Sequence, residues 1–373
     1  MKKATNYLWV YLTIFCLTSC NTKEQPMKKE NASFYIGTYT NGGSEGIYKY
    51  DINDEGKFIL GKLVAKTQNP SFLTLSTDKQ FLVAVNEIDE KGEGKIESYK
   101  ISKDSLTFVN KVNSGGAHPC HVVVHGNNVF VANYTGGNMS FSSLNKGKLS
   151  NLDLVQHQGK GTTSRQEAPH VHSVIVNKQN DEIIAIDLGT NELWFSALNV
   201  STQKLESTSQ GKLIMEEGAG PRHAAFHPIK NNWLYVFNEL NSTISLINRN
   251  QEGVYEVINS VSTLPKDFKG DSYGADIHIS SDGKFLYASN RGHNSISIFT
   301  IDQDNGSIQL ITTESVKGNW PRNFTLSPDE KYVLVANQYS NNIVSFLRNA
   351  ETGLLTYIDQ IKIEAPVCIL FKE

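Results

Sequence analysis

A unit of about fifty residues recurs along this chain. Each copy starts with a proline or glycine and, after a short gap, an apolar run of strand length, as in residues 69–76 and 320–327. The residues just before these runs are Phe72, His121, His172, His223, Asp276, Asn323 and Cys368. Their spacings of 49, 51, 51, 53, 47 and 45 residues are too regular for coincidence. The spacing therefore predicts an array of equivalent structural units.

Each unit contains further runs of strand length. In six copies the second run ends in a polar residue, namely Asn86, Asn133, Asp187, Asn238, Asn290 and Asn337. A turn signal such as Ser281-Asp282-Gly283 separates the first two runs, and a third run rich in β-branched and aromatic residues follows. No long helical period appears, and each unit leaves room for a fourth strand. Short antiparallel strands repeated in this way predict an all-β fold, a seven-bladed β-propeller.

The two ends of the chain complete each other. Residues 34–38 resemble a second run that lacks its first partner, and residues 366–371 resemble a first run that lacks its second. We therefore expect the last blade to be closed by the N- and C-terminal strands, which leaves no open sheet edge. This predicts one propeller domain over residues 33–373.

The N-terminus has the pattern of an export signal. Two lysines precede a mostly apolar run at residues 7–17, which ends in Leu-Thr-Ser-Cys20. This pattern predicts a signal peptide at residues 1–19, too short to span a bilayer comfortably. Leu-Thr-Ser-Cys resembles the lipobox of bacterial lipoproteins, which implies lipidation of Cys20 and a polar tether at residues 20–32. The alternative is an ordinary signal peptide that happens to end near a cysteine.

Composition excludes several classes of partner. The formal net charge of −3 gives no reason to expect nucleic acid, and no protein partner is implied. Cys120 and Cys368 have no cysteine close by in the sequence, so a zinc ribbon or redox dithiol is unsupported. We expect both to be free buried thiols.

Antiparallel neighbours bring the start of the first strand and the end of the second to the same end of each blade. Both sets of polar residues therefore converge on one mouth of the central channel. The strongest candidates for a site there are His172, Arg222, Glu239 and Arg291, followed by His170, His223, Asn133, Asp187, Asn290 and Arg322. No carboxylate or cysteine completes a metal-ligand set around His170 and His172, so neither a metal nor a cofactor is expected.

Structural roles are the alternative for several of these residues. Asn and Asp at strand ends commonly bond turn backbone, the role expected of Asn86, Asn238 and Asn337. His227, before a proline, is expected to be a satisfied turn histidine. The charged residues have a second interpretation as buried ion pairs that tie neighbouring blades together.

Three motif pairs carry a family resemblance: "APHVHS" with "DLGTNEL", "GAGPRHAAFHP" with "NELNSTI", and "SNRGHNSI". They resemble the lactonase family of seven-bladed propellers, which includes the propeller-type 6-phosphogluconolactonases and is similar to fungal carboxymuconate-lactonising enzymes. The resemblance covers residues 33–373. It implies an active site of His172, Arg222, Glu239 and Arg291.

The resemblance implies a carboxylic-ester hydrolase that opens a small-molecule lactone without a metal. His172 is the expected base, with Glu239 as the alternative, and the arginines would bind an anionic group or the oxyanion. Because export to the cell envelope is predicted, as a lipoprotein at the periplasmic or outer-membrane face, the expected substrate is 6-phosphogluconolactone or a related acidic lactone outside the cytoplasm. The alternatives are a cycloisomerase acting on a muconate-type dicarboxylate and a non-catalytic propeller that binds sugar or protein.

Overall fold

The computed structural model describes residues 1–5 and 31–372. Most of the predicted signal peptide, Cys20 with its predicted lipidation, and most of the tether lie outside the described residues and stay predictions. Residues 31–373 form one compact unit. Across the described part of the chain, no helix is long and apolar enough to cross a membrane.

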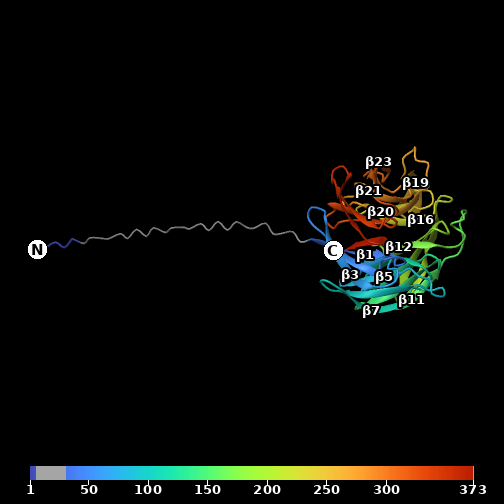
Figure 1. Ribbon diagram of the computed structural model, residues 1–373, viewed down its shortest axis with the longest axis horizontal. Coiled ribbons are helices and arrows are strands. Elements are labelled where there is room, and N and C mark those ends of the chain that lie inside the picture. The colour runs from blue at the N-terminus through green and yellow to red at the C-terminus, as the bar shows by residue number, and fades with distance from the viewer. Residues whose placement is uncertain (6–30, 373) are drawn as a thin grey trace. The chain divides into compact units, whose positions relative to one another are not determined.

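Seven four-stranded antiparallel sheets make up the described fold, which confirms the predicted seven-bladed β-propeller. Figure 1 shows these sheets as the blades of the propeller. From the channel outward, six blades are β4(Leu73–Leu75), β5(Phe81–Asn86), β6(Lys95–Ile101), β7(Leu106–Asn113); β8(Pro119–His125), β9(Asn128–Asn133), β10(Asn138–Asn145), β11(Lys148–Gln156); β12(Val171–Asn177), β13(Glu182–Asp187), β14(Glu192–Asn199), β15(Lys204–Ile214); β16(Pro221–Phe226), β17(Trp233–Asn238), β18(Thr243–Arg249), β19(Tyr255–Ser262); β20(Tyr273–Ile279), β21(Phe285–Arg291), β22(Ser295–Ile301), β23(Ile308–Ser315); and β24(Pro321–Leu326), β25(Tyr332–Asn337), β26(Asn342–Arg348), β27(Leu355–Lys362).

The seventh blade joins the two ends of the propeller, as predicted. Its order is β28(Pro366–Phe371), β1(Ala32–Thr38), β2(Gly46–Ile52) and β3(Phe58–Lys66). Strand β28 pairs antiparallel with β1, with Phe34 opposite Phe371 and Ile36 opposite Ile369. In Figure 1 the C-terminus lies beside the blue strand β1.

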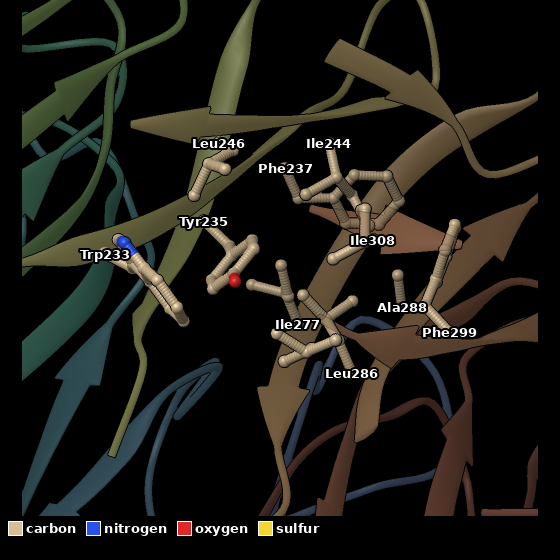
Figure 2. Close-up of a cluster of buried hydrophobic side chains, with 11 residues drawn as sticks. Trp233, Tyr235, Phe237, Ile244, Leu246, Ile277, Leu286, Ala288, Phe299 and Ile308 are labelled. Carbon is tan, nitrogen blue, oxygen red and sulfur yellow. The ribbon is translucent and has the colours of Figure 1, made fainter. Parts of the chain in front are cut away.

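The hydrophobic core lies between neighbouring blades. Figure 2 shows one such cluster, between the β16–β19 and β20–β23 sheets, which includes Trp233, Tyr235, Phe237, Ile277, Leu286 and Ala288. Each second strand is covered on both faces, and for this reason its sequence is a continuous apolar run without alternation, as in the fully buried β25. The outermost strands, such as β7 and β23, are largely exposed. This packing holds the innermost strands around one channel.

Candidate active site

Most of the innermost strands have an irregular register near the mouth of the channel. In β8, β12, β16, β20 and β24 the register with the next strand shifts near the start of the strand. In β16, for example, Pro221 pairs with Asn238 but His223 pairs with Phe237, so that Arg222 is the extra residue. A shift of this kind bends a strand and redirects its side chains, and it is common beside active sites.

This register corrects the sequence alignment at one position. The repeat spacing placed His172 in the same row as His121 and His223. In the structure, Ser173 pairs with Ile186 just as His223 pairs with Phe237, and His172 is the extra residue of β12. His172 therefore occupies the row of Arg222, one residue before the row of His223. The regular spacing concealed this difference because β12 begins at Val171, two residues after its proline, whereas β8 and β16 begin at the proline itself.

Arg222, Arg291 and Glu239 meet at the mouth, as the sequence predicted. Glu239 follows β17, and its Oε2 lies 3.1 Å from Arg222 Nε and 2.7 Å from Arg291 Nη2. Arg222 Nη1 also donates to the Ala275 carbonyl at 2.6 Å, and Arg291 Nη2 donates to the Gly274 carbonyl at 2.7 Å. These bonds join two neighbouring blades, so the structural role considered for the charges is present too.

The neighbouring arginines keep the Glu239 carboxylate ionised. Burial alone raises the pKa of Glu239, but Arg291, Arg222 and Arg165 outweigh it and lower the pKa to about 2. Such a carboxylate is ionised but takes up a proton poorly at neutral pH. Burial and the neighbouring arginines lower the pKa of Arg222 to about 9, so its guanidinium stays charged at neutral pH. Glu239 thus orients the arginines.

Arg165 is a third partner of Glu239, and the sequence analysis missed it. Its Nη2 lies 3.2 Å from Glu239 Oε1 and 3.1 Å from the Tyr134 hydroxyl. Arg165 belongs to the connection between β11 and β12, which Gln166 anchors by donating to the Leu188 carbonyl at 2.8 Å. This loop lies outside the two aligned sets of strand residues, so the repeat gave no signal for Arg165.

Arg322 is held on the opposite side of the mouth by Glu87 and Tyr39. Its Nη2 lies 3.9 Å from Glu87 Oε1, and its guanidinium lies 5.5 Å from the centre of the Tyr39 ring. The Tyr39 hydroxyl donates to Glu87 at 2.8 Å. A cavity of about 10 Å³ lies here, close to the volume that one water molecule needs. Its lining includes Ser71, Glu87, Cys120, Arg222, His223 and Arg322.

Aromatic rings form a layer across the channel below the arginines. His223 lies 5.5 Å from His121, 5.4 Å from His172 and 6.1 Å from Phe72, measured between ring centres. These residues come from four different blades, so their rings meet near the axis. Beyond the layer the channel widens to a cavity of about 360 Å³ that has neither lysine nor arginine in its lining. The positive charge therefore lies on the arginine side alone.

Burial keeps the layer histidines neutral. It lowers the pKa of His172 well below the usual range, and Arg222 and His223 lower it further. Burial, followed by Arg222, lowers the pKa of His223 to about 4 against the opposing effect of Asp276. A neutral imidazole accepts a proton, so the layer supplies potential bases.

His170 lies at the edge of the site. Its ring stacks on Tyr134 at 4.4 Å, its Nδ1 donates to the Tyr134 carbonyl at 3.1 Å, and its Nε2 lies 3.4 Å from Glu167. In the described residues, no group of three or more His, Cys, Asp or Glu side chains is arranged to hold a metal ion.

Asn133, Asp187 and Asn290, which the sequence analysis predicted as substrate-binding residues, make hydrogen bonds within the protein. All three are fully buried. Asp187 accepts from the backbone of His170 and from His157 Nδ1. Asn133 donates to Asn138 and to the Ser114 carbonyl, while Asn290 donates to Ser297 and accepts from Thr263. Asn and Asp are favoured at the ends of the second strands because their side chains can bond to backbone groups of the adjoining turns.

The turn-backbone role expected of Asn86 and Asn337 and the satisfied state expected of His227 are confirmed, whereas Asn238 bonds to side-chain hydroxyls instead of backbone. Asn86 donates to the Gln68 carbonyl and Asn337 to the Val316 carbonyl, while Asn238 bonds to Thr243 and Ser245. His227 is fully buried, donates to the Gly283 carbonyl and accepts from the backbone of Lys230. The two cysteines of the described chain, Cys120 and Cys368, are free and buried.

Comparison with known proteins agrees with this fold and site. A family model described as "Lactonase, 7-bladed beta-propeller" matches residues 33–371. The chain is 38% identical to the 6-phosphogluconolactonase of Bacillus subtilis, over 90% of this chain and 97% of that protein. It is 36% identical to a 6-phosphogluconolactonase of Formosa agariphila, over 87% and 95% of the two chains.

A solved structure extends the comparison. The periplasmic gluconolactonase of Pseudomonas aeruginosa superposes with a TM-score of 0.87 at 28% identity, covering 92% of this chain and 99% of that one. The chain described here therefore belongs to the lactonase family of seven-bladed β-propellers. These relatives support a hydrolase that acts on lactones.

Proposed function

We propose that the protein hydrolyses the ring ester of an acidic sugar lactone, such as 6-phosphogluconolactone or a related lactone outside the cytoplasm. The observation that carries this proposal is the charge of the mouth, where four guanidinium groups share two carboxylate partners. These groups are Arg165, Arg222, Arg291 and Arg322, paired with Glu239 and Glu87. A surplus of arginine charge suits a phosphate or carboxylate substituent, which arginine binds in two-pronged geometry.

The reaction uses both the histidine rings and the arginines of the mouth. A water molecule attacks the lactone carbonyl carbon while a neutral imidazole takes its proton. The carbonyl oxygen becomes an oxyanion, which the guanidinium groups of Arg222 and Arg291 stabilise. When the intermediate collapses, the ring C–O bond breaks and the departing oxygen receives the proton from the imidazolium. The product is the open-chain acid.

Hydrolysis is tested on the full chain in the presence of EDTA. Acid release from δ-gluconolactone and 6-phosphogluconolactone is followed against spontaneous hydrolysis, with a muconate as a third substrate. We expect acceleration that is greater for the phosphorylated lactone and insensitive to EDTA. No acceleration with either lactone would refute the proposal, and lactone formation from the muconate would replace it with a cycloisomerase.

Export and lipid anchoring through Cys20 form the second part of the proposal. Support comes from the lipobox-like Leu-Thr-Ser-Cys20 and from the periplasmic gluconolactonase among the related structures. Mass spectrometry of the mature protein from a bacterial membrane fraction is expected to find a lipidated N-terminal cysteine. A chain that keeps its Met1, or an unmodified protein in the soluble fraction, would contradict the anchor and leave the hydrolase proposal intact.

A further inference from the structure

The ring layer contains a histidine–aspartate pair that the family resemblance did not single out as catalytic. His223 Nδ1 lies 2.8 Å from Asp276 Oδ1, across the interface between the β16–β19 and β20–β23 blades. Asp276 also accepts from Asn323 Nδ2 at 2.5 Å and from the backbone of Ile277 at 3.1 Å. Because an ionised carboxylate only accepts, His223 carries its proton on Nδ1, and its Nε2 has a free lone pair.

His223 lies beside a cavity of the size of one water molecule. His223 is 7% exposed, and its buried Nε2 has no hydrogen-bond partner within the described chain. His223 also lines the water-sized cavity beside Arg222 and Arg322. A lone pair, a space for one water and two guanidinium groups are thus brought together in one place. These are the parts that water attack on a carbonyl carbon requires.

The other candidates for a base lack this combination. Glu239 is held by three arginines. His172 Nδ1 lies 3.8 Å from the Cys120 thiol, and within the described residues no carboxylate is recorded in contact with its ring. A general base is normally oriented by a third group through a hydrogen bond, and His172 has no such carboxylate.

A second buried histidine–aspartate pair shows that such a pair alone does not define a catalytic site. His157 Nδ1 lies 2.7 Å from Asp187, and its Nε2 also has no hydrogen-bond partner in the described part of the chain. However, the His157 ring stacks flat on Trp194 at 3.9 Å, and Asp187 binds turn backbone. His157 lines neither the small cavity nor the wider channel. Position at the cavity distinguishes His223.

We propose that His223 is the general base of the lactone hydrolysis proposed above, and that Asp276 is its positioning residue. The inference rests on that function. His223 Nε2 takes a proton from water as the water oxygen bonds to the lactone carbonyl carbon. The ring C–O bond then breaks, and the departing oxygen receives the same proton from Nε2. Asp276 stays ionised and stabilises the imidazolium that forms between the two steps.

The electrostatic surroundings give this base an acidic working range. The titratable and charged groups that face the pair are His121, His172, Arg222, His278, Arg322 and Cys368. Burial and Arg222 together lower the pKa of His223 to about 4. The base is therefore active above this pH, and kcat/KM falls as the pH drops through it.

Kinetics of matched variants test the assignment on the lactone that the wild-type protein hydrolyses best. We expect His223→Ala and Asp276→Asn to lower kcat at least about 100-fold with little change in KM, since general bases contribute about that much or more. His172→Ala should lose much less. Added imidazole should restore part of the activity of His223→Ala. The control is His125→Ala, which removes a partly exposed histidine paired with Asp181 at 2.8 Å, far along β8 from the mouth.

Folding is checked by circular dichroism and melting temperature. His223→Gln replaces His223→Ala if the alanine variant does not fold. Nitrogen-15 NMR of the histidines provides a readout besides turnover, with the His223 signal of an Nδ1–H tautomer in the wild type and a changed signal in Asp276→Asn. If the wild type hydrolyses lactones and His223→Ala stays within tenfold of it, the base assignment is wrong and the hydrolase proposal survives. If the wild type hydrolyses no lactone, the function fails and the base assignment fails with it.

Discussion

Glu239 connects the arginine cluster through a single carboxylate. Both of its oxygens are used, one by Arg222 and Arg291 and the other by Arg165. The side chains of Arg222 and Arg291 are almost fully buried, so their charges depend on this partner for compensation. Removing one member of a buried ion pair costs more than the pair contributes, because it leaves an uncompensated charge.

The Glu239→Gln variant should therefore be destabilised. We expect the free energy of unfolding to fall by about 3–5 kcal/mol, the usual cost of breaking a buried pair. Inorganic phosphate should raise the melting temperature of the variant more than that of the wild type, since an added anion can occupy the unpaired guanidinium groups. Thermal unfolding measures both effects, with the exposed Glu256→Gln as control. Equal melting temperatures for wild type and Glu239→Gln would contradict this account.

The layer histidines should make stability depend on pH. The pKa of His223 falls from about 6.5 in an unfolded chain to about 4 in the folded one, and the pKa values of His121 and His172 are lowered too. Between these pH values the unfolded chain binds more protons than the native one, so protonation favours unfolding. The contribution of these neutral histidines to the free energy of unfolding is complete above about pH 6.5 and is lost as the pH falls toward 4.

We expect the melting temperature to drop by at least about 5 °C between pH 7 and pH 4.5, as follows from a loss of a few kcal/mol. Scanning calorimetry across this range measures the drop. His223→Gln, which cannot take up this proton, should show a smaller one. A melting temperature that stays constant over the same range would show that the buried histidines do not exchange protons on unfolding.

Sequence reasoning found the residues of the site better than their arrangement. Arg222, Glu239 and Arg291 meet as expected because the repeat assigns each to the same end of its blade. Arg165 lay beyond prediction because its loop lies outside the two aligned sets of strand residues. The row of His172 was misassigned because spacing along a sequence does not reveal a shift in strand register.

At the scale of elements, the connection between β11 and β12 lies at the mouth of the channel. It carries Arg165, whose side chain is half exposed while Glu239 beneath it is buried. A half-exposed ion pair contributes little to folding stability because water screens it. Its charge is nonetheless directed at the place where an anionic substrate enters, so we assign it to substrate binding.

The Arg165→Ala variant should bind substrate weakly but fold normally. We expect KM to rise about tenfold, the loss of one charge-assisted hydrogen bond, with kcat changed much less. The melting temperature should stay within about 2 °C of the wild type. Steady-state kinetics with the phosphorylated lactone measures the change, and Lys160→Ala on the same loop is the matched control. A fall in kcat without a change in KM would place Arg165 in the chemical step instead.

At the scale of the whole molecule, the propeller depends on its last strand. Strand β28 covers Phe34 and Ile36 of β1 and also lines the channel. The repeat spacing together with incomplete units at both ends was sufficient to predict this closure from the sequence. The fold could be predicted this far because a ring of equal units has few ways to end.

Deleting residues 365–373 should abolish cooperative folding. The truncated chain would expose the edge of β1 and the apolar surface that β28 covers. We expect loss of the single thermal transition and a strong tendency to aggregate, measured by calorimetry and light scattering. A chain shortened by residues 372–373 keeps β28 and should behave as the wild type. A monomeric, cooperatively folded protein after the longer deletion would show that the ring closes without β28.

The pairing of β1 with β28 also has a consequence for biosynthesis. Among the described strands, β1 is synthesised first and its partner β28 last. A nascent chain therefore cannot complete the ring before about residue 370 has been added. Until then the growing chain has two unprotected sheet edges, a state that other chains can join. The propeller can therefore close only after β28 has been synthesised and released from the ribosomal tunnel.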